Sequence, residues 1–243
     1  MLIPSIFKPH SLIAAQSTRL NDLLQQAGKK PVTEFSNDND LFDRHQTRDE
    51  FLNQLGITID QLAYSHQIHD NKILVADKPQ GAEGYDAIIT NKPNVYVCVT
   101  IADCTPVLIY DTKNKAVAAI HAGWRGTVAK IVSETLKLMQ VQYGTKGEDC
   151  LAFIGACIGK NNFEVGEEVA IHFSENEKWY NTSKNKYFVD LKLANKKQLL
   201  QFGVKENNIE ISDRCTISDN AKFYSYRLEK GKTGRMLALI GIK

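Results

Sequence analysis

Three runs of apolar and β-branched residues in the middle of the chain form the clearest pattern in the sequence. They cover residues 94–103, 106–111 and 115–123, and a short turn-forming stretch separates the last two. Buried strands read as short, continuous apolar runs, so these segments predict a sheet. Further strand-like runs are found at 151–159, 223–227 and 236–242, and the last two are expected to be closing strands.

Apolar residues at helical spacing predict helices around these strands. The clearest helix is expected to start at a Thr127 cap and to end at Gly144. Another is expected to start at an Asp190 cap and to end at Gly203. Two shorter helices are predicted in the N-terminal third, at 20–27 and 51–55.

The order of these elements predicts an α+β or mixed α/β protein, with mixed β-sheets flanked by helices. The alternation of strands and helices is too irregular for a Rossmann fold or a barrel. We find no internal repeat and no linker-like stretch, so we expect one domain covering residues 1–243. Hydrophobic residues make up 43% and charged residues 24% of the chain, which is typical of a globular protein.

Charge and cysteine content narrow the classes of partner. The net charge of +2 gives no reason to expect nucleic acid or an anionic membrane as a partner. The five cysteines are odd in number and form no C-x-x-C pair, which favours reduced thiols and a cytoplasmic location. The first residues are a poor match to a signal peptide, and no apolar run reaches the ~20 residues of a membrane span. No obligate protein partner is evident.

Three segments place reactive residues at the ends of predicted strands. They are SHQIHD at 65–70, IADCTPVLIYD at 101–111 and AIHAGWRGT at 119–127. Cys104 and His121 lie at neighbouring strand ends, and a histidine from the first segment would complete a set of two histidines and one cysteine. Three protein ligands plus a water molecule are typical of a catalytic zinc site. Such a site would activate the water as a nucleophile.

Spacing alone leaves other interpretations open. The separations are wide, and each of these residues is also compatible with an ordinary structural position. Cys104 and His121 could instead form a nucleophile–base pair without a metal. The segment around Arg125 has a further interpretation, because two glycines and a helix N-terminus beside a guanidinium suit a phosphate. A tight strand-to-helix turn would give the same glycine pattern.

At these residues the chain resembles a known bacterial family. The motifs SHQIH, ADCTPVLIYD, HAGWRGT, IGACIGKNNFEVGEEV, VDLKLAN and the late CT, FYSYR and GRM occur in the family's order, from about residue 17 to the end. The family has been called laccase domain, polyphenol oxidase or peptidoglycan-editing factor, and is now described as a multifunctional purine nucleoside phosphorylase. The resemblance implies an α+β fold shared with cysteine-hydrolase-like toxins.

The resemblance also implies a zinc ion held by His69, Cys104 and His121, with purine nucleosides and phosphate as substrates. The implied activities are phosphorolysis of adenosine, inosine and methylthioadenosine, and deamination of adenosine. These reactions need a proton shuttle, for which Asp103 and His66 are candidates beside Cys104. They also need a cation for phosphate, and the candidates are Arg19, Arg125 and Arg227.

The sequence departs from the family pattern at three places. Asp70 and Ala156 replace a glycine and a proline, and LNDLLQQ replaces a glycine-rich stretch after Arg19. None of these changes removes an implied zinc ligand, but the last affects the expected shape of the substrate pocket.

Three rival functions remain at this stage. A Cys104–His121 hydrolase could edit peptidoglycan precursors such as UDP-muramyl species. A copper-dependent phenol oxidase needs more histidines than the six present, although Cu²⁺ could replace Zn²⁺ in vitro. A zinc-stabilised binding module would need a fourth ligand, for which Cys98 and His66 are the nearest candidates.

Overall fold

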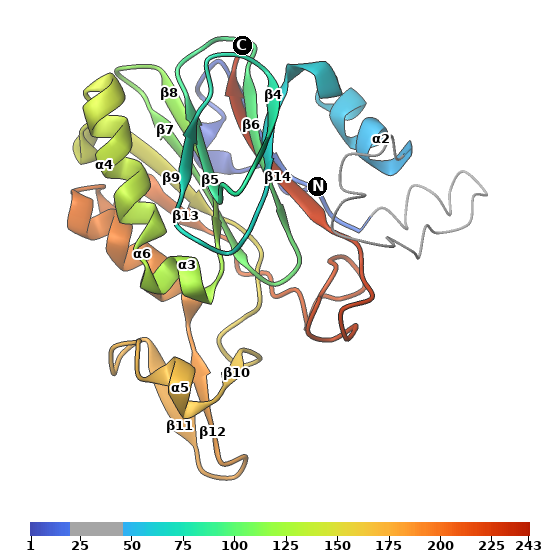
Figure 1. The fold of residues 1–243 in the computed structure, drawn as a ribbon, viewed down its shortest axis with the longest axis vertical. Coiled ribbons are helices and arrows are strands. Elements are labelled where there is room, and N and C mark those ends of the chain that lie inside the picture. The colour runs from blue at the N-terminus through green and yellow to red at the C-terminus, as the bar shows by residue number, and fades with distance from the viewer. Residues whose placement is uncertain (20–45) are drawn as a thin grey trace.

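The computed structural model describes residues 1–19 and 46–243, in which two large β-sheets are stacked face to face (Figure 1). The first sheet contains, in spatial order, β1 (Leu12–Gln16), β14 (Met236–Ile242), β6 (Tyr96–Ile101), β2 (Leu62–His66) and β4 (Gln80–Glu83). The second contains β13 (Ile209–Ile211), β9 (Cys150–Ile154), β7 (Thr105–Asp111), β8 (Ala116–Ala122), β5 (Ala87–Thr90) and β3 (Ile73–Val75). Both sheets mix parallel and antiparallel pairs, which confirms the α+β expectation.

Helices cover the outer faces of the two sheets. The six-stranded sheet is covered by α3 (Trp124–Val128), α4 (Ile131–Tyr143) and α6 (Leu191–Phe202), and the five-stranded sheet by α2 (Gln46–Gln54). A small lobe projects below them in Figure 1 and contains α5 (Glu167–Ala170), β10 (Glu164–Val165), β11 (Lys178–Asn181) and β12 (Lys186–Val189). Short 3-10 turns complete the fold at Ser5–Phe7, Ile59–Gln61, Gly147–Asp149 and Glu206–Asn208. No helix in the described ranges is long and apolar enough to cross a membrane.

Period-two alternation along the central strands explains this layering. In β6, Val97 and Val99 belong to the core between the two sheets, whereas Cys98 points into the core under α2. In β7, Leu108 faces the other sheet and Ile109 faces α4 and α6. Successive strand side chains point to opposite faces, so a fully apolar strand serves two cores.

Two of the predicted helices are confirmed, one of them at both ends. The Asp190 side chain accepts a hydrogen bond from the Leu193 N–H at 2.9 Å and caps α6, and Gly203 ends it with a φ of 100°. Helix α2 covers most of the predicted 51–55 segment, and Gly56 follows it with a φ of 71°. The segment predicted as helical at 20–27 lies outside the described residues.

The helix predicted from Thr127 is divided in two, so its expected cap is wrong. Thr127 lies inside α3, and α4 starts after Lys130, whose φ of 62° breaks the helix. The Thr127 hydroxyl accepts a hydrogen bond from the Asn195 amide on α6 at 3.1 Å. Its side chain therefore joins two helices instead of capping one. Gly144 ends α4 as predicted.

The strand predicted at 223–227 is also wrong, whereas the strand at 236–242 is confirmed as β14. The Phe223 N–H bonds to the Asp219 carbonyl in a turn at 3.1 Å, and the N–H groups of Tyr224, Ser225 and Arg227 bond to side chains instead of a neighbouring strand. Ser225 N–H donates to Glu229 at 3.2 Å, and Arg227 N–H donates to Asp103 at 2.7 Å. Two carboxylates thus supply acceptors that a strand partner would have provided.

A buried glutamine joins the two large sheets. The Gln16 amide donates to the Ala156 carbonyl at 3.0 Å and accepts from the Ala156 N–H at 2.8 Å. The Gln16 side chain is completely buried. Gly155 permits this contact, because a Cβ there would lie 2.4 Å from the Gln16 oxygen.

We expect Gln16→Leu to lower the free energy of unfolding by about 2–4 kcal/mol, because it leaves a buried N–H and a buried carbonyl without partners. Urea denaturation followed by circular dichroism measures this. The control is Gln54→Leu at an exposed helix end, for which we expect less than about 0.5 kcal/mol. Equal effects of the two variants would contradict the proposed role of Gln16.

Candidate metal centre

Three side chains from separate segments converge at one end of the stacked sheets. His69 lies in the loop after β2, Cys104 lies in the turn between β6 and β7, and His121 lies near the end of β8. Their ligand atoms all lie within 4.8 Å of one another. The two imidazole rings meet edge to face, with centroids 4.8 Å apart. The tertiary structure therefore brings together the three residues that the sequence analysis selected.

Asp86 organises two of these three residues. Its carboxylate lies 2.7 Å from His121 Nδ1, and both side chains are buried. The same carboxylate accepts the backbone N–H groups of Ile68, His69 and Asp70 at 2.9–3.1 Å. One carboxylate thus orients the His121 ring and fixes the loop that carries His69, as supporting carboxylates do in metal sites.

Gln67 fixes the same loop from its other side. Its amide donates to the Thr100 carbonyl at 2.9 Å and accepts from the Thr100 N–H at 2.7 Å. His69 adopts a left-handed φ of 62°, which is uncommon for a residue other than glycine. The hydrogen bonds of Gln67 and Asp86 on either side hold this conformation in place.

Gly123 allows the backbone after His121 to lie against the site. A Cβ at this position would lie 3.1 Å from Cys104 Sγ and 3.4 Å from His69 Cδ2. A side chain at this position would therefore crowd the Cys104 sulfur and contact the His69 ring. The glycine predicted from the HAGWRGT pattern to allow close backbone approach has that role here.

The electrostatics of the site favour a thiolate. Burial alone raises the pKa of Cys104, but the adjacent His121 and His69 lower it, and the net pKa lies below that of an ordinary thiol. Burial lowers the pKa of His121, whereas Cys104 and Asp86 raise it, and the net shift is upward. A thiolate is the form of cysteine that acts as metal ligand or nucleophile.

Asp103, a candidate proton shuttle, is held tightly. Its carboxylate accepts hydrogen bonds from the Thr216 hydroxyl, from the Ser225 hydroxyl at 3.0 Å and from the Arg227 N–H at 2.7 Å. Its side chain is nearly buried, and its φ is 91°. These contacts fix the 215–227 segment beside Cys104. A catalytic role of Asp103 stays a prediction.

The two candidates for a fourth ligand lie outside the convergent group. Among the described residues, the cluster with metal-ligand spacing contains neither His66 nor Cys98. Cys98 is buried in the core beneath α2, where burial raises its pKa to about 12. His66 ends β2 and is half-buried, three residues before His69. Its role as an acid or base stays a prediction.

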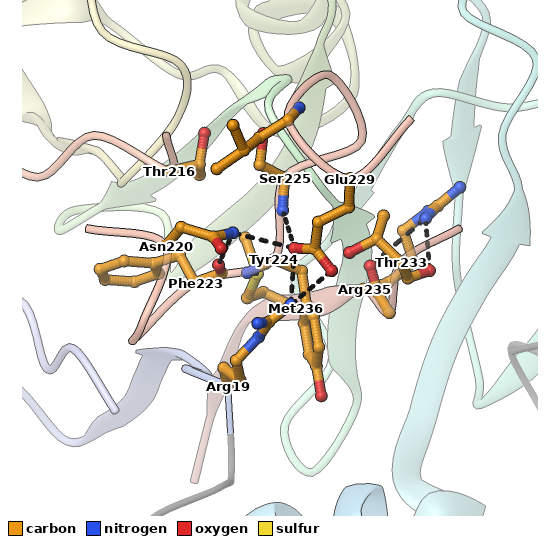
Figure 2. Close-up of polar contacts among 12 residues, drawn as sticks. Arg19, Thr216, Asn220, Phe223, Tyr224, Ser225, Glu229, Thr233, Arg235 and Met236 are labelled. Carbon is orange, nitrogen blue, oxygen red and sulfur yellow. Dashed lines mark hydrogen bonds and ion pairs between the residues drawn. The ribbon is translucent and has the colours of Figure 1, made fainter. Parts of the chain in front are cut away.

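Arg19 is committed to an ion pair (Figure 2). Its guanidinium lies 2.5 Å from the Glu229 carboxylate and 4.5 Å above the Tyr224 ring. Glu229 also accepts hydrogen bonds from the Asn220 amide at 2.9 Å and the Ser225 N–H at 3.2 Å. Figure 2 shows these groups gathered around the carboxylate. Arg19 therefore joins the N-terminal segment to the loop that Asp103 holds.

Arg227 and Arg125 have different surroundings. Arg227 donates from its guanidinium to the Glu164 carbonyl at 2.8 Å, which links the 215–227 segment to the small lobe. Arg125 is exposed, with its guanidinium 4.4 Å above the Trp124 ring. It lies two residues after Gly123, where an added Cβ would meet Cys104 and His69. Among the three candidate phosphate ligands, Arg125 is nearest in sequence to a convergent residue, and its guanidinium is exposed.

Asp86 is not among the site residues predicted from the sequence. The only signal is a single carboxylate directly before the buried strand β5. It was indistinguishable from an ordinary turn residue, because its partners lie 16–35 positions away in the chain.

The chain is similar in sequence to proteins of one known family. Residues 29–243 match the family model described as multi-copper polyphenol oxidoreductase laccase. A protein named purine nucleoside phosphorylase from Bacteroides thetaiotaomicron is 40% identical over 75% of this chain and 74% of its own length. Purine nucleoside phosphorylase YlmD from Bacillus subtilis is 33% identical over 82% of this chain and 77% of its own length.

Solved structures agree with these sequence matches. The crystal structure of YlmD from Geobacillus stearothermophilus has a TM-score of 0.84 and 25% identity, with 99% of this chain and 94% of that chain covered. The hypothetical protein YfiH from Bacillus licheniformis shares the fold, with a TM-score of 0.85, 24% identity, and 100% and 96% of the two chains covered. The family match covers most of the sequence, and the chain belongs to the multi-copper polyphenol oxidoreductase laccase family.

Proposed function

We propose that this protein is a zinc-dependent purine nucleoside enzyme. Its reactions would be the phosphorolysis of adenosine, inosine and methylthioadenosine, and the deamination of adenosine. The observation that carries the proposal is the convergence of His69, Cys104 and His121, with Asp86 behind them. The names of relatives that are 40% and 33% identical support purine nucleosides and phosphate as substrates.

The convergent residues fit zinc. One thiolate and two imidazoles are ligands that zinc accepts, and three protein ligands leave a position for substrate or water, as in catalytic zinc sites. The Nδ1 atom of His121 lies 2.7 Å from the Asp86 carboxylate. Such a contact sets the tautomer of a metal-binding histidine and leaves the other ring nitrogen for the metal. Zinc bound here would supply a Lewis acid that activates water and withdraws charge from a reacting group.

The surrounding residues would bind and orient the substrate. Arg125 would bind phosphate through its exposed guanidinium, because the planar fork matches phosphate oxygens. Arg227 would contribute to the same anion, although it already bonds to Glu164. Arg19 is paired with Glu229 and would act by positioning the loop. His66 and Asp103 are the candidates for moving protons.

A second candidate function follows from the same geometry. Cys104 lies beside His121, and His121 Nδ1 lies within hydrogen-bond distance of Asp86. A catalytic nucleophile, its base and an orienting carboxylate are arranged in the same order. A cysteine hydrolase acting on peptidoglycan precursors would use these three residues without a metal. Metal content decides between the two functions, because a nucleophile site needs a free thiolate.

We expect Asp86→Asn to weaken zinc binding by about 10- to 100-fold, because the amide cannot accept every hydrogen bond of the carboxylate. Competition with a chromogenic zinc chelator measures the dissociation constant. The matched control is Asp77→Asn, whose carboxylate is 82% exposed and should leave zinc binding unchanged. Equal affinity of Asp86→Asn and the wild type would contradict the role of Asp86.

We expect the wild type to carry about one zinc per chain and to release adenine and inosine from adenosine and phosphate. Cys104→Ala should lose both properties, since it removes the thiolate ligand, whereas Cys150→Ala should keep them. Elemental analysis and chromatography give the two readouts. Zinc-free wild type that leaves adenosine unchanged but hydrolyses UDP-muramyl species would favour the cysteine hydrolase. Bound copper with phenol oxidation would favour the oxidase.

We expect Arg125→Ala to raise the KM for phosphate about 10- to 100-fold, because a hydrogen bond to a charged group contributes about 1.5–3 kcal/mol. The KM for adenosine should change much less. Lys186→Ala, at an exposed position in the small lobe, is the control. Steady-state kinetics at varied phosphate concentration measure the effect. An unchanged KM for phosphate would assign the phosphate to another cation.

A further inference from the structure

Two cysteines outside the metal centre lie side by side on neighbouring backbone segments. Cys157 follows β9, Cys215 follows β13, and they form an isolated parallel bridge. The next N–H along, that of Thr216, donates to the Cys157 carbonyl at 3.0 Å. Paired strands lie about 4.8 Å apart. This spacing falls inside the range of roughly 4.4–6.8 Å that the Cα atoms of a disulfide span.

The Cys215 sulfur is surrounded by hydrogen-bond donors. It accepts from the Gly159 N–H at 3.1 Å, from the Asn162 amide at 3.2 Å and from the Ser218 N–H at 3.5 Å. Burial raises the pKa of Cys215, but the N–H groups of Ser218 and Gly159 lower it, and the net shift is downward. The side chain is partly exposed, so a small oxidant can reach it.

Cys157 has the opposite environment. It is completely buried, and burial raises its pKa to about 11. A low-pKa, accessible cysteine beside a second thiol is the usual arrangement of a peroxide-reactive pair, in which the second cysteine resolves the first. Cys98 and Cys150 differ, because both are buried and burial raises each pKa to about 12. Both cysteines of the bridge are free thiols in this structure.

We propose that Cys215 and Cys157 form an oxidation site for small hydroperoxides, separate from the metal centre. The Cys215 thiolate attacks one oxygen of hydrogen peroxide, which breaks the O–O bond and gives a sulfenic acid and hydroxide. The Cys157 thiol then attacks the Cys215 sulfur, and its proton leaves with the hydroxyl group as water. Two thiols supply two electrons to the peroxide, and one disulfide forms.

The disulfide would act on the loop beside Cys104. To bond to Cys157, the Cys215 sulfur must leave the donors of Gly159 and Asn162. The adjacent Thr216 hydroxyl donates to Asp103, so a shift of Cys215 pulls on the residue that precedes the metal ligand. The oxidation site therefore lies close to the residues of the proposed nucleoside site. The oxidation itself does not depend on the nucleoside activity.

Mass spectrometry of the metal-loaded protein after hydrogen peroxide treatment tests the proposal. Trypsin gives one peptide with Cys215 (215–222) and one with both Cys150 and Cys157 (147–160). Chymotrypsin cuts after Phe153 and separates these two cysteines. We expect a Cys157–Cys215 linkage that dithiothreitol reverses, with a loss of about two thiols per chain. Cys98 and Cys150 should remain alkylatable after denaturation.

Two variants test the separate roles of the two cysteines. In Cys157→Ala, the sulfenic acid has no resolving thiol, so dimedone should label Cys215. In Cys215→Ser, Cys157 should stay reduced, because a buried thiol with a raised pKa reacts slowly with peroxide. The proposal is overturned if the wild type keeps Cys157 and Cys215 reduced while Cys104 is oxidised. Dimedone labelling of Cys215 without a disulfide in the wild type would overturn the resolving role of Cys157.

Discussion

The hydrogen bonds that Asp86 accepts join two parts of the chain that would otherwise be independent. A buried carboxylate is costly unless donors surround it, and Asp86 has three backbone N–H groups and one imidazole. Burial raises its pKa, yet the contacts with His121 and the 68–70 backbone leave the net shift downward, so it stays ionised. The left-handed backbone at His69 follows from this arrangement. The ligand geometry is thus held by protein hydrogen bonds around the position proposed for the metal.

Asp103 and Glu229 are likewise carboxylates surrounded by hydrogen-bond donors, and Asp103 directly precedes Cys104 in the chain. Each accepts backbone N–H and side-chain donors from the irregular 215–235 segment, which lies outside the named strands and pairs with another segment through the isolated bridge at Cys215. Backbone donors that no sheet satisfies need other acceptors, and carboxylates provide strong ones. The loop next to the candidate metal centre is therefore ordered by charge-assisted hydrogen bonds, among them the one that Arg19 donates to Glu229.

The cluster of His69, Cys104 and His121 bears directly on the description of the family as multi-copper oxidoreductases. A multi-copper site needs several groups of ligands, whereas the described residues offer this one group of three. Its thiolate and imidazole donors suit one zinc ion, and they would also bind copper when copper is supplied. The names of the relatives agree with the nucleoside proposal better than with phenol oxidation.

The sequence pattern alone determined the apolar strands β6, β7 and β8, the ends of α6, and Cys104 and His121 as convergent residues, whereas the choice of His69 over His66 came from the family resemblance. Each of these depends on local periodicity, on a cap, or on an unusual residue at a strand end. Only the tertiary structure selected Asp86 and Gln67, turned the expected strand at 223–227 into a carboxylate-bound loop, and placed Cys157 beside Cys215. These features come from contacts between segments far apart in the chain. The residues adjacent in sequence do not reveal such partners, because sheet pairing and buried hydrogen bonds form only when the layers pack.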